Sequence, residues 1–230
     1  MSISTKKEFI YLVIPKTGSS TVRRAIGKHI DVRKETSHFS EHVSVEQFLA
    51  SQYSHLFKNF FKFSFVRNPY DRLYSGYLQD YYGAYKLPHW SDAKRPIFEK
   101  IGKNFERYLL EYAASADRER DPYWIIFCPM HRFTHVNGRF ALDWVGRTET
   151  LEADLKMLSD RLDLGVERVA SVNVRRESPA QDTHLPRYTR DAVQWVNETY
   201  REDFELFGYR MVDPSSIPSV ARTDSHPATP

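Results

Sequence analysis

The sequence predicts an α/β fold: a three-layer domain in which helices flank a central, mainly parallel sheet. Residues 9–14 form an unbroken apolar run rich in β-branched and aromatic side chains, which is typical of a strand buried on both faces. Residues 61–66, Phe-Lys-Phe-Ser-Phe-Val, predict a second strand. Each run is followed by a short turn and then by apolar residues at helical spacing. Two strand-to-helix units in one chain favour a parallel sheet covered by helices.

The other elements follow from the same patterns. The first helix comes after the small-residue turn at residues 16–20. The second helix begins at Pro69, which suits the first helical position, and Asn68 can cap it. Apolar spacing further along the chain predicts helices around residues 105–112 and 151–162, a short strand at 144–146, and a last helix after Thr189.

Length and composition limit the class of protein. The chain has 230 residues, of which 41% are hydrophobic and 27% charged, and this excludes a fibre, a collagen-like repeat and a chain too polar to fold. We expect one domain over residues 1–210 and a disordered tail over residues 211–230, where proline, serine and threonine leave little to bury. The single cysteine, Cys128, excludes an internal disulfide.

Charge and hydropathy narrow the partners. No apolar stretch approaches the ~20 residues that a membrane helix needs, and no signal segment precedes residue 9, so we expect no membrane segment in this chain. The net charge of +3 does not indicate a general affinity for nucleic acid. Residues 1–34, however, hold eight Lys and Arg side chains against two acidic ones, so this end of the chain favours an anion.

The turn after the first strand has the pattern of an anion site. A strand that runs through a small-residue loop into a helix directs backbone N–H groups and the positive end of the helix dipole at one point. Gly18 lets the backbone approach closely, and Lys16 adds a mobile positive charge. Further hydroxyl donors are Thr17, Ser19, Ser20 and Thr21. The alternative is that these residues only cap a helix and that Lys16 is solvated.

A nucleoside-triphosphate loop matches this turn less well. Such a loop has its lysine directly before Ser or Thr at the helix start, after two spaced glycines. Here Lys16 precedes Gly18, which is the only glycine of the turn. No apolar strand ending in an evident magnesium carboxylate follows downstream either. The order of residues therefore favours the transfer of an anion without a metal.

Two motifs carry a resemblance to a known family. Residues 15–21, Pro-Lys-Thr-Gly-Ser-Ser-Thr, and residues 63–75, Phe-Ser-Phe-Val-Arg-Asn-Pro-Tyr-Asp-Arg-Leu-Tyr-Ser, together resemble the two cofactor signatures of the Golgi-type carbohydrate sulfotransferases and their bacterial relatives. The resemblance implies a P-loop-like sulfotransferase fold and 3′-phosphoadenosine-5′-phosphosulfate (PAPS) as co-substrate, with no metal. In that family the first motif holds the 5′-phosphosulfate. The second motif holds the 3′-phosphate through an arginine and a serine, which are Arg67 and Ser75 here.

A third segment extends the resemblance and implies a general base. Residues 41–48, Glu-His-Val-Ser-Val-Glu-Gln-Phe, are similar to the segment around the catalytic histidine of heparan sulfate 2-O-sulfotransferase. The similarity implies that His42 takes the proton of the acceptor hydroxyl, while Lys16 stabilises the leaving phosphate during in-line transfer. A neutral imidazole can accept a proton at cellular pH. His38 lies in the same connection and remains the alternative base from the residues alone.

The resemblance implies O-sulfation of an acceptor hydroxyl, with a carbohydrate as the first candidate acceptor. Two other functions stay open: a non-catalytic module that binds a nucleotide or a sulfated glycan, and a small-molecule kinase, which would bind ATP with magnesium. We expect a short cytoplasmic protein of the bacterial type, because the first strand begins at residue 9. The alternative is the lumenal catalytic domain of a Golgi enzyme without its anchor.

Three further groups have interpretations that the sequence leaves open. The segment after the second motif is either a wall for a sugar ring or, in its first two tyrosines, core packing; its residues are Tyr77, Tyr81, Tyr82, Tyr85, Trp90, Lys94 and Arg95. A zinc-compatible spacing without an evident fourth ligand is formed by Cys128, His131 and His135. Late contacts to the 3′-phosphate are assigned to Arg175 and Arg176.

Overall fold

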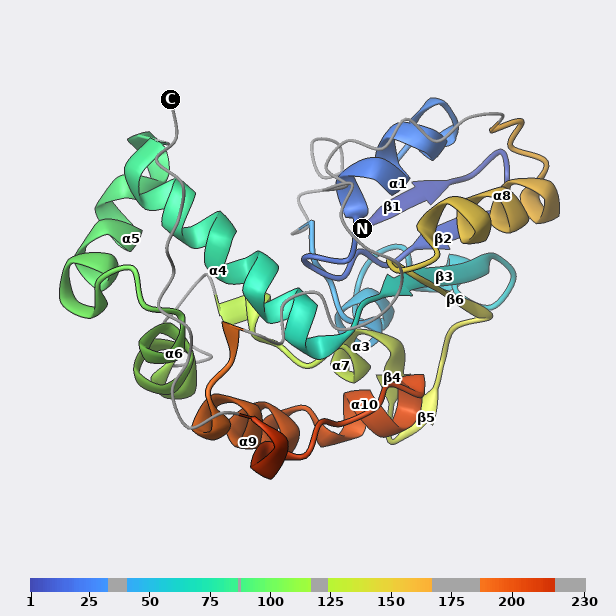
Figure 1. Cartoon of the computed structure of the whole chain (residues 1–230). Coiled ribbons are helices and arrows are strands. Elements are labelled where there is room, and N and C mark those ends of the chain that lie inside the picture. The colour runs from blue at the N-terminus through green and yellow to red at the C-terminus, as the bar shows by residue number, and fades with distance from the viewer. Residues whose placement is uncertain (33–40, 87, 117–123, 167–186, 218–230) are drawn as a thin grey trace. The chain divides into compact units, whose positions relative to one another are not determined.

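The structure is a computed structural model, and it describes residues 1–32, 41–86, 88–116, 124–166 and 187–217. The chain divides into two compact units, which are described separately (Figure 1). The first unit comprises Met1–Arg67 and Cys128–Ala180, and the second comprises Asn68–Phe127 and Gln181–Pro230.

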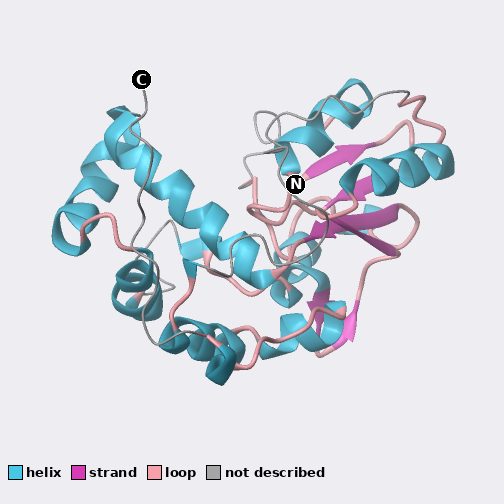
Figure 2. Cartoon of the chain, in the orientation of Figure 1, coloured by secondary structure: helices cyan, strands magenta, loops and turns pink. Residues whose placement is uncertain are grey.

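The first unit contains a sheet of four strands, drawn in magenta in Figure 2. Its strands are, in spatial order, β1 (Ser2–Ser4), β2 (Phe9–Tyr11), β3 (Phe61–Val66) and β6 (Trp144–Arg147). Strand β1 pairs antiparallel with β2, whereas the pairs β2–β3 and β3–β6 are parallel. The predicted α/β class with a mainly parallel sheet is therefore confirmed.

Helices cover both faces of this sheet (Figure 1). Helices α1 (Ser19–Ile26) and α8 (Leu151–Leu162) lie on one face, and α3 (Val45–Leu49) lies on the other. The strands supply alternate residues to the two sides because successive side chains of a strand point to opposite faces. Phe9 and Tyr11 pack with α1 and α8, whereas Ile10 packs with α3. The first unit thus has the three layers that the sequence predicts.

Shorter elements complete the first unit. The 3₁₀ turns η1 (Gly27–His29) and η2 (Ser54–Leu56) follow α1 and α3, and α7 (His131–Thr134) precedes an antiparallel hairpin of β4 (His135–Val136) and β5 (Arg139–Phe140). A capping box starts α3: the Ser44 hydroxyl accepts from the Gln47 N–H at 3.1 Å, and the Gln47 side chain accepts from the Ser44 N–H at 2.9 Å.

The second unit is helical throughout the part that the structure describes. Its elements are α4 (Pro69–Lys86), α5 (Pro88–Ile101), α6 (Phe105–Arg107), the π-helical turn η3 (Tyr108–Tyr112), η4 (Ala113–Ser115), η5 (Trp124–Ile126), α9 (Arg190–Thr199), α10 (Arg201–Phe207) and η7 (Pro214–Ser216). Its core is built largely from aromatic rings, among them Tyr74, Tyr77, Phe98, Phe105 and Tyr108. Helix α4 begins at Pro69, and the Asn68 side chain accepts from the Tyr70 N–H at 3.0 Å, as the sequence predicts.

Most of the predicted elements are present, with differences in extent. The first strand is shorter than predicted, because only residues 9–11 are in the strand, although the Leu12 N–H still donates to the Phe63 carbonyl at 3.0 Å. The helix predicted around residues 105–112 changes from an α-helix to a π-helical turn. Disorder of residues 211–230 stays a prediction: residues 214–216 form η7, and residues 218–230 lie outside the described residues. No helix in the described ranges is long and apolar enough to cross a membrane.

A buried ion pair joins two helices of the second unit. The Lys94 ammonium on α5 and the Asp80 carboxylate on α4 are 2.8 Å apart, and both side chains are fully buried. Two tyrosine hydroxyls complete the group. The Tyr108 hydroxyl donates to Asp80 Oδ2 at 2.8 Å, and Lys94 Nζ donates to the Tyr112 hydroxyl at 2.8 Å. Burial, and then the charge of Asp80, raise the pKa of Tyr108 well above its usual value, so the phenol remains a donor.

We expect Lys94→Met to lower the free energy of unfolding by about 3–5 kcal/mol, because it leaves the buried Asp80 carboxylate without its counter-ion. The matched control is Lys156→Met, which breaks an exposed pair with Asp160 and changes that free energy by less than about 0.5 kcal/mol. Urea denaturation measures both. Equal losses in the two variants would show that the buried pair does not stabilise the second unit.

Candidate active site

The turn between β2 and α1 has an unusual backbone conformation. Lys16 and Gly18 both have positive φ angles, 68° and 77°, so the chain passes twice through the left-handed region. The N–H groups of Thr21 and Val22 donate to the Gly18 carbonyl at 3.0 and 3.1 Å, which starts the helix. Among the described residues, no side chain caps the N-terminus of α1. The first N–H groups of the helix and its positive dipole end are therefore suited to hold an anion.

Gly18 is required for both its conformation and its space. A Cβ atom at this position would lie 3.1 Å from Leu151 Cδ2 and 3.7 Å from Thr148 Cγ2. A side chain here would therefore be crowded as well as strained. The turn is a closely packed cradle, and its wall comes from the segment between β6 and α8.

The four Ser and Thr residues of the turn differ in burial, and therefore in whether their hydroxyls are accessible to a ligand. Thr17 is fully buried, and its hydroxyl donates to the Ile14 carbonyl at 2.9 Å, so this proton holds the turn together. Thr21 is also buried. Ser19 is half-buried and Ser20 is exposed, both in the first turn of α1. Ser19 and Ser20 are therefore the two hydroxyl residues of the turn that stay accessible at the N-terminus of α1.

Arg67 lies beside this turn. It follows the last residue of β3, and its Nη1 donates to the Lys16 carbonyl at 3.4 Å. The Arg67 N–H also contacts Met130 Sδ at 3.5 Å. Parallel pairing of β2 with β3 brings the ends of both strands to one edge of the sheet. The Arg67 guanidinium thus contacts the backbone of Lys16 within the first unit.

Ser75 belongs to the second unit, where it is half-buried in α4. Its predicted role beside Arg67 at the 3′-phosphate stays a prediction.

His42 is attached to the same part of the first unit. Its Nδ1 lies 2.9 Å from the carbonyl of Val13, which comes two residues after the end of the short strand β2. A carbonyl can only accept, so Nδ1 carries the proton in this contact. In the neutral ring, Nε2 then has the free electron pair and can act as a base. The neighbouring residue Glu41 forms an ion pair with Arg23 of α1. His38, the alternative base, lies outside the described residues.

The end of β6 contributes to the site, and the sequence did not assign it a role. The N–H and the hydroxyl of Thr148 donate to the Val66 carbonyl at 2.8 and 3.0 Å, which holds the end of β6 against the end of β3. Leu151 then packs over Gly18. The parallel strand predicted at residues 144–146 was the signal for this third strand end, but only the tertiary structure shows that it walls the turn.

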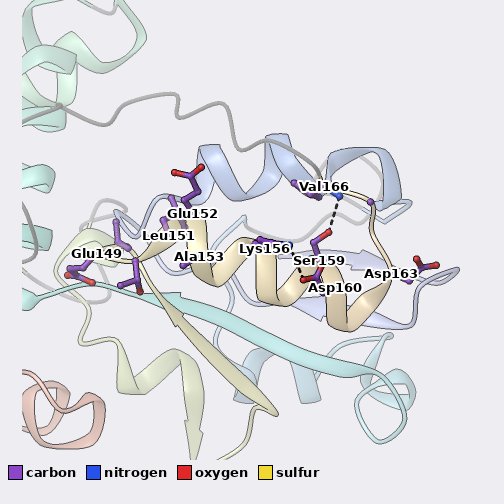
Figure 3. Close-up of a pocket in the computed structure, with 12 residues that line it drawn as sticks. Glu149, Leu151, Glu152, Ala153, Lys156, Ser159, Asp160, Asp163 and Val166 are labelled. Atoms are coloured by element: carbon purple, nitrogen blue, oxygen red, sulfur yellow. Dashed lines mark hydrogen bonds and ion pairs between the residues drawn. The ribbon is translucent and has the colours of Figure 1, made fainter.

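A cavity of 950 Å³ runs along α8 in the first unit (Figure 3). Thr148 and Leu151, which flank Gly18, lie at one end of it. Most of the ionisable residues that line it are acidic; these residues are Glu149, Glu152, Lys156, Asp160 and Asp163. Carboxylates repel a multiply charged anion. The turn, rather than this cavity, is therefore the better place for such a ligand.

The structure also bears on the three other groups of candidate residues: the aromatic segment after the second motif, the late arginines and the zinc-compatible cluster. Tyr77 and Lys94 are buried, and Lys94 pairs with Asp80, so neither forms part of a surface wall for a sugar. Tyr82 and Tyr85 are exposed. The side chain of Trp90 lies outside the described residues, as do Arg175 and Arg176. Within the described residues, no cluster of three or more His, Cys, Asp or Glu side chains could hold a metal ion, and Cys128 is buried.

Comparison with known proteins gives relatives of one kind. The chain is 26% identical to carbohydrate sulfotransferase 14 of Mus musculus over 97% of its own length, and 27% identical to that of Homo sapiens over 90%. It is 23% identical to carbohydrate sulfotransferase 11 of Rattus norvegicus over 94% of its length. The chain spans 62%, 59% and 67% of these three relatives. No solved structure matches the chain significantly.

These relatives correct the expected location. The prediction of a short cytoplasmic protein of the bacterial type is wrong, because the chain matches carbohydrate sulfotransferases of mouse, zebrafish and rat. The physical reason for the error is that a catalytic domain has the same strands and turns in either compartment.

The family model described as "Sulfotransferase family" matches residues 1–210, which include the turn at Gly18, His42 and Arg67. The match covers the turn at the ends of two parallel strands, and the chain belongs to the sulfotransferase family, a family of transferase enzymes.

Proposed function

We propose that this protein transfers the sulfuryl group of PAPS to a hydroxyl group of a carbohydrate acceptor. The observation that carries the proposal is that Arg67, at the end of β3, donates to the Lys16 carbonyl in the turn that leads into α1, a helix without a side-chain cap at its N-terminus. The names of the relatives, all of which are carbohydrate sulfotransferases, support the transfer and the acceptor class.

The residues of the turn fit a phosphosulfate. Gly18 adopts φ 77° without the strain that a side chain would add, and this conformation leads into a helix whose first N–H groups can bind an oxyanion. When bound, the donor supplies a sulfuryl group attached to a phosphate that can leave. The mobile ammonium of Lys16 and the hydroxyls of Ser19 and Ser20 would stabilise the negative charge that develops on the leaving side.

The 3′-phosphate is assigned to Arg67 and Ser75. A guanidinium offers forked N–H donors that match a phosphate, and Arg67 is held beside the turn through its contact with the Lys16 carbonyl. Ser75, which lies in α4, would add a hydroxyl donor to the same phosphate. Both assignments rest on the motif at residues 63–75.

His42 would remove the proton of the acceptor hydroxyl. The Val13 carbonyl fixes the imidazole with its proton on Nδ1, so that Nε2 is the basic atom. The ion pair of Glu41 with Arg23 ties the residue next to His42 to the helix that starts the anion site. The base and the anion cradle are thereby connected to the same two elements, the chain after β2 and α1.

The direct test is transfer of labelled sulfate from PAPS to a panel of glycans, with and without a metal chelator. We expect transfer to at least one glycan and tight binding of adenosine 3′,5′-bisphosphate in the presence of the chelator. Binding of ATP that requires magnesium would instead favour a small-molecule kinase. A folded protein that binds the bisphosphate but transfers no sulfate to any glycan would favour a binding module.

His42→Ala should lower kcat by about 10²–10⁴-fold, because the acceptor hydroxyl loses its general base. Binding of adenosine 3′,5′-bisphosphate, measured by calorimetry, should stay close to that of the unchanged protein. His55→Ala is the matched control, since His55 is exposed and its Nδ1 contacts the Gln52 carbonyl at 3.0 Å outside the site. Full turnover in His42→Ala would assign the base to another residue.

Gly18→Ala should weaken binding of adenosine 3′,5′-bisphosphate by about tenfold, because a side chain at φ 77° costs about 1–2 kcal/mol and crowds Leu151. Gly27→Ala is the control, since Gly27 has φ −60° and a Cβ there meets no atom within 4 Å. Thermal unfolding of both variants separates a local effect from a loss of fold. Unchanged affinity in a folded Gly18→Ala protein would place the phosphate elsewhere.

A further inference from the structure

An aromatic face lies on the surface of the second unit, formed by Tyr81, Tyr82 and Tyr85 of α4. Tyr82 is 39% exposed and Tyr85 is 48% exposed, whereas Tyr81 is half-buried. The ring centroids of Tyr81 and Tyr85 are 5.1 Å apart, and those of Tyr81 and Tyr82 are 6.0 Å apart. Three large rings thus gather at one end of α4, and two of them are open to solvent.

The core beneath holds this aromatic face in place. Phe98 of α5 is buried, and its ring centroid lies 5.4 Å from that of Tyr81 and 6.5 Å from that of Tyr85. Phe98 in turn stacks on buried Tyr108 at 5.8 Å. Rings that rest on a packed core lose little conformational entropy when a ligand covers them. The aromatic face is therefore ready to bind without rearrangement.

A positive charge lies against these rings, and two more are exposed on the neighbouring helix α5. The Lys103 ammonium lies 5.1 Å from the Tyr81 ring centroid, in cation–π geometry. Arg95 and Lys100 are exposed on α5, one turn before and two residues after Phe98. Glu99 is the only acidic residue between positions 94 and 103. The surface next to the aromatic face therefore attracts an anion.

We propose that the aromatic face and Lys103 form a subsite for an acidic polysaccharide, through which the enzyme holds the chain that it sulfates. This inference rests on the proposed function. A sugar ring presents C–H groups on its faces, which pack on the open rings of Tyr82 and Tyr85, and its hydroxyls can bond with the phenols. Carboxylates along the chain would pair with Lys103 and Arg95. Exposed rings edged by cations match this alternation of apolar faces and negative charges.

The proposal is tested with the full chain by binding chondroitin and heparosan polymers, with neutral dextran as the uncharged comparison. Tyr85→Ala should weaken binding of an acidic polymer about three- to tenfold, while Tyr85→Phe, which keeps the ring, should retain most of it. Lys103→Gln should also weaken binding and reduce its dependence on salt. The matched control is Leu206→Ala, since Leu206 is 50% exposed on α10 and lies apart from this sequence segment.

Sulfate transfer separates the subsite from the catalytic proposal. Tyr85→Ala should raise KM for the polymer about three- to tenfold and leave kcat, and binding of adenosine 3′,5′-bisphosphate, unchanged. If the unchanged protein transfers sulfate but Tyr85→Ala and Lys103→Gln bind the polymer as it does, the subsite is wrong and the proposed function stands. If no glycan accepts sulfate while polymer binding still depends on Tyr85, the proposed sulfate transfer is wrong and the proposed polysaccharide-binding surface is supported.

Two further results would overturn the subsite. Tighter binding of single-stranded oligo(dT) than of either polysaccharide would assign the aromatic face to nucleic acid. A change of oligomeric state in Tyr85→Ala, measured by analytical ultracentrifugation, would assign it to contact between copies of the chain.

Discussion

Parallel pairing of β2 with β3 is the constraint on which the candidate site depends. The register places Phe9 opposite Phe61 and Tyr11 opposite Phe63, so both strands deliver the chain to the same edge of the sheet. There the turn at residues 15–18 meets Arg67, whose guanidinium donates to the Lys16 carbonyl. A shift of one residue in this register would turn the buried side chains of β2 to the opposite face. Because the side chains of β2 are buried on both faces of the sheet, its register with β3 is fixed, and so is the place where the two motifs meet.

The anion turn shows how packing and function share the same residues. Lys16 and Gly18 are held at positive φ, which costs free energy for a residue with a side chain. The hydroxyl of buried Thr17 donates back to Ile14, and Leu151 of α8 closes over Gly18. These contacts keep the strained turn in one conformation. An anion can therefore be bound by N–H groups that are already arranged.

The core of the second unit differs from that of the first in its many aromatic side chains with polar hydroxyls. Its core consists largely of stacked and edge-to-face aromatic rings, and their hydroxyls need polar partners when buried. Tyr108 finds such a partner in Asp80, which in turn is balanced by Lys94. Along α4 the same series of tyrosines passes from the buried Tyr77 to the exposed Tyr85. One helix thus supplies both a core and a surface with aromatic character.

The sequence by itself determined the α/β class, the helices after residues 18, 68, 150 and 189, and the short motifs at which an anion can bind. These features are local: apolar periodicity and caps act within one or two turns of chain. Short elements were missed, since β1 and α3 have few residues and gain stability only from the sheet that they cover. Contacts between distant segments were decided by the tertiary structure alone. The sequence offered Lys94 as part of a wall for a sugar ring, and only the fold brings Asp80 beside it. The wall that Leu151 forms over Gly18 likewise exists because three strand ends meet at one edge of the sheet.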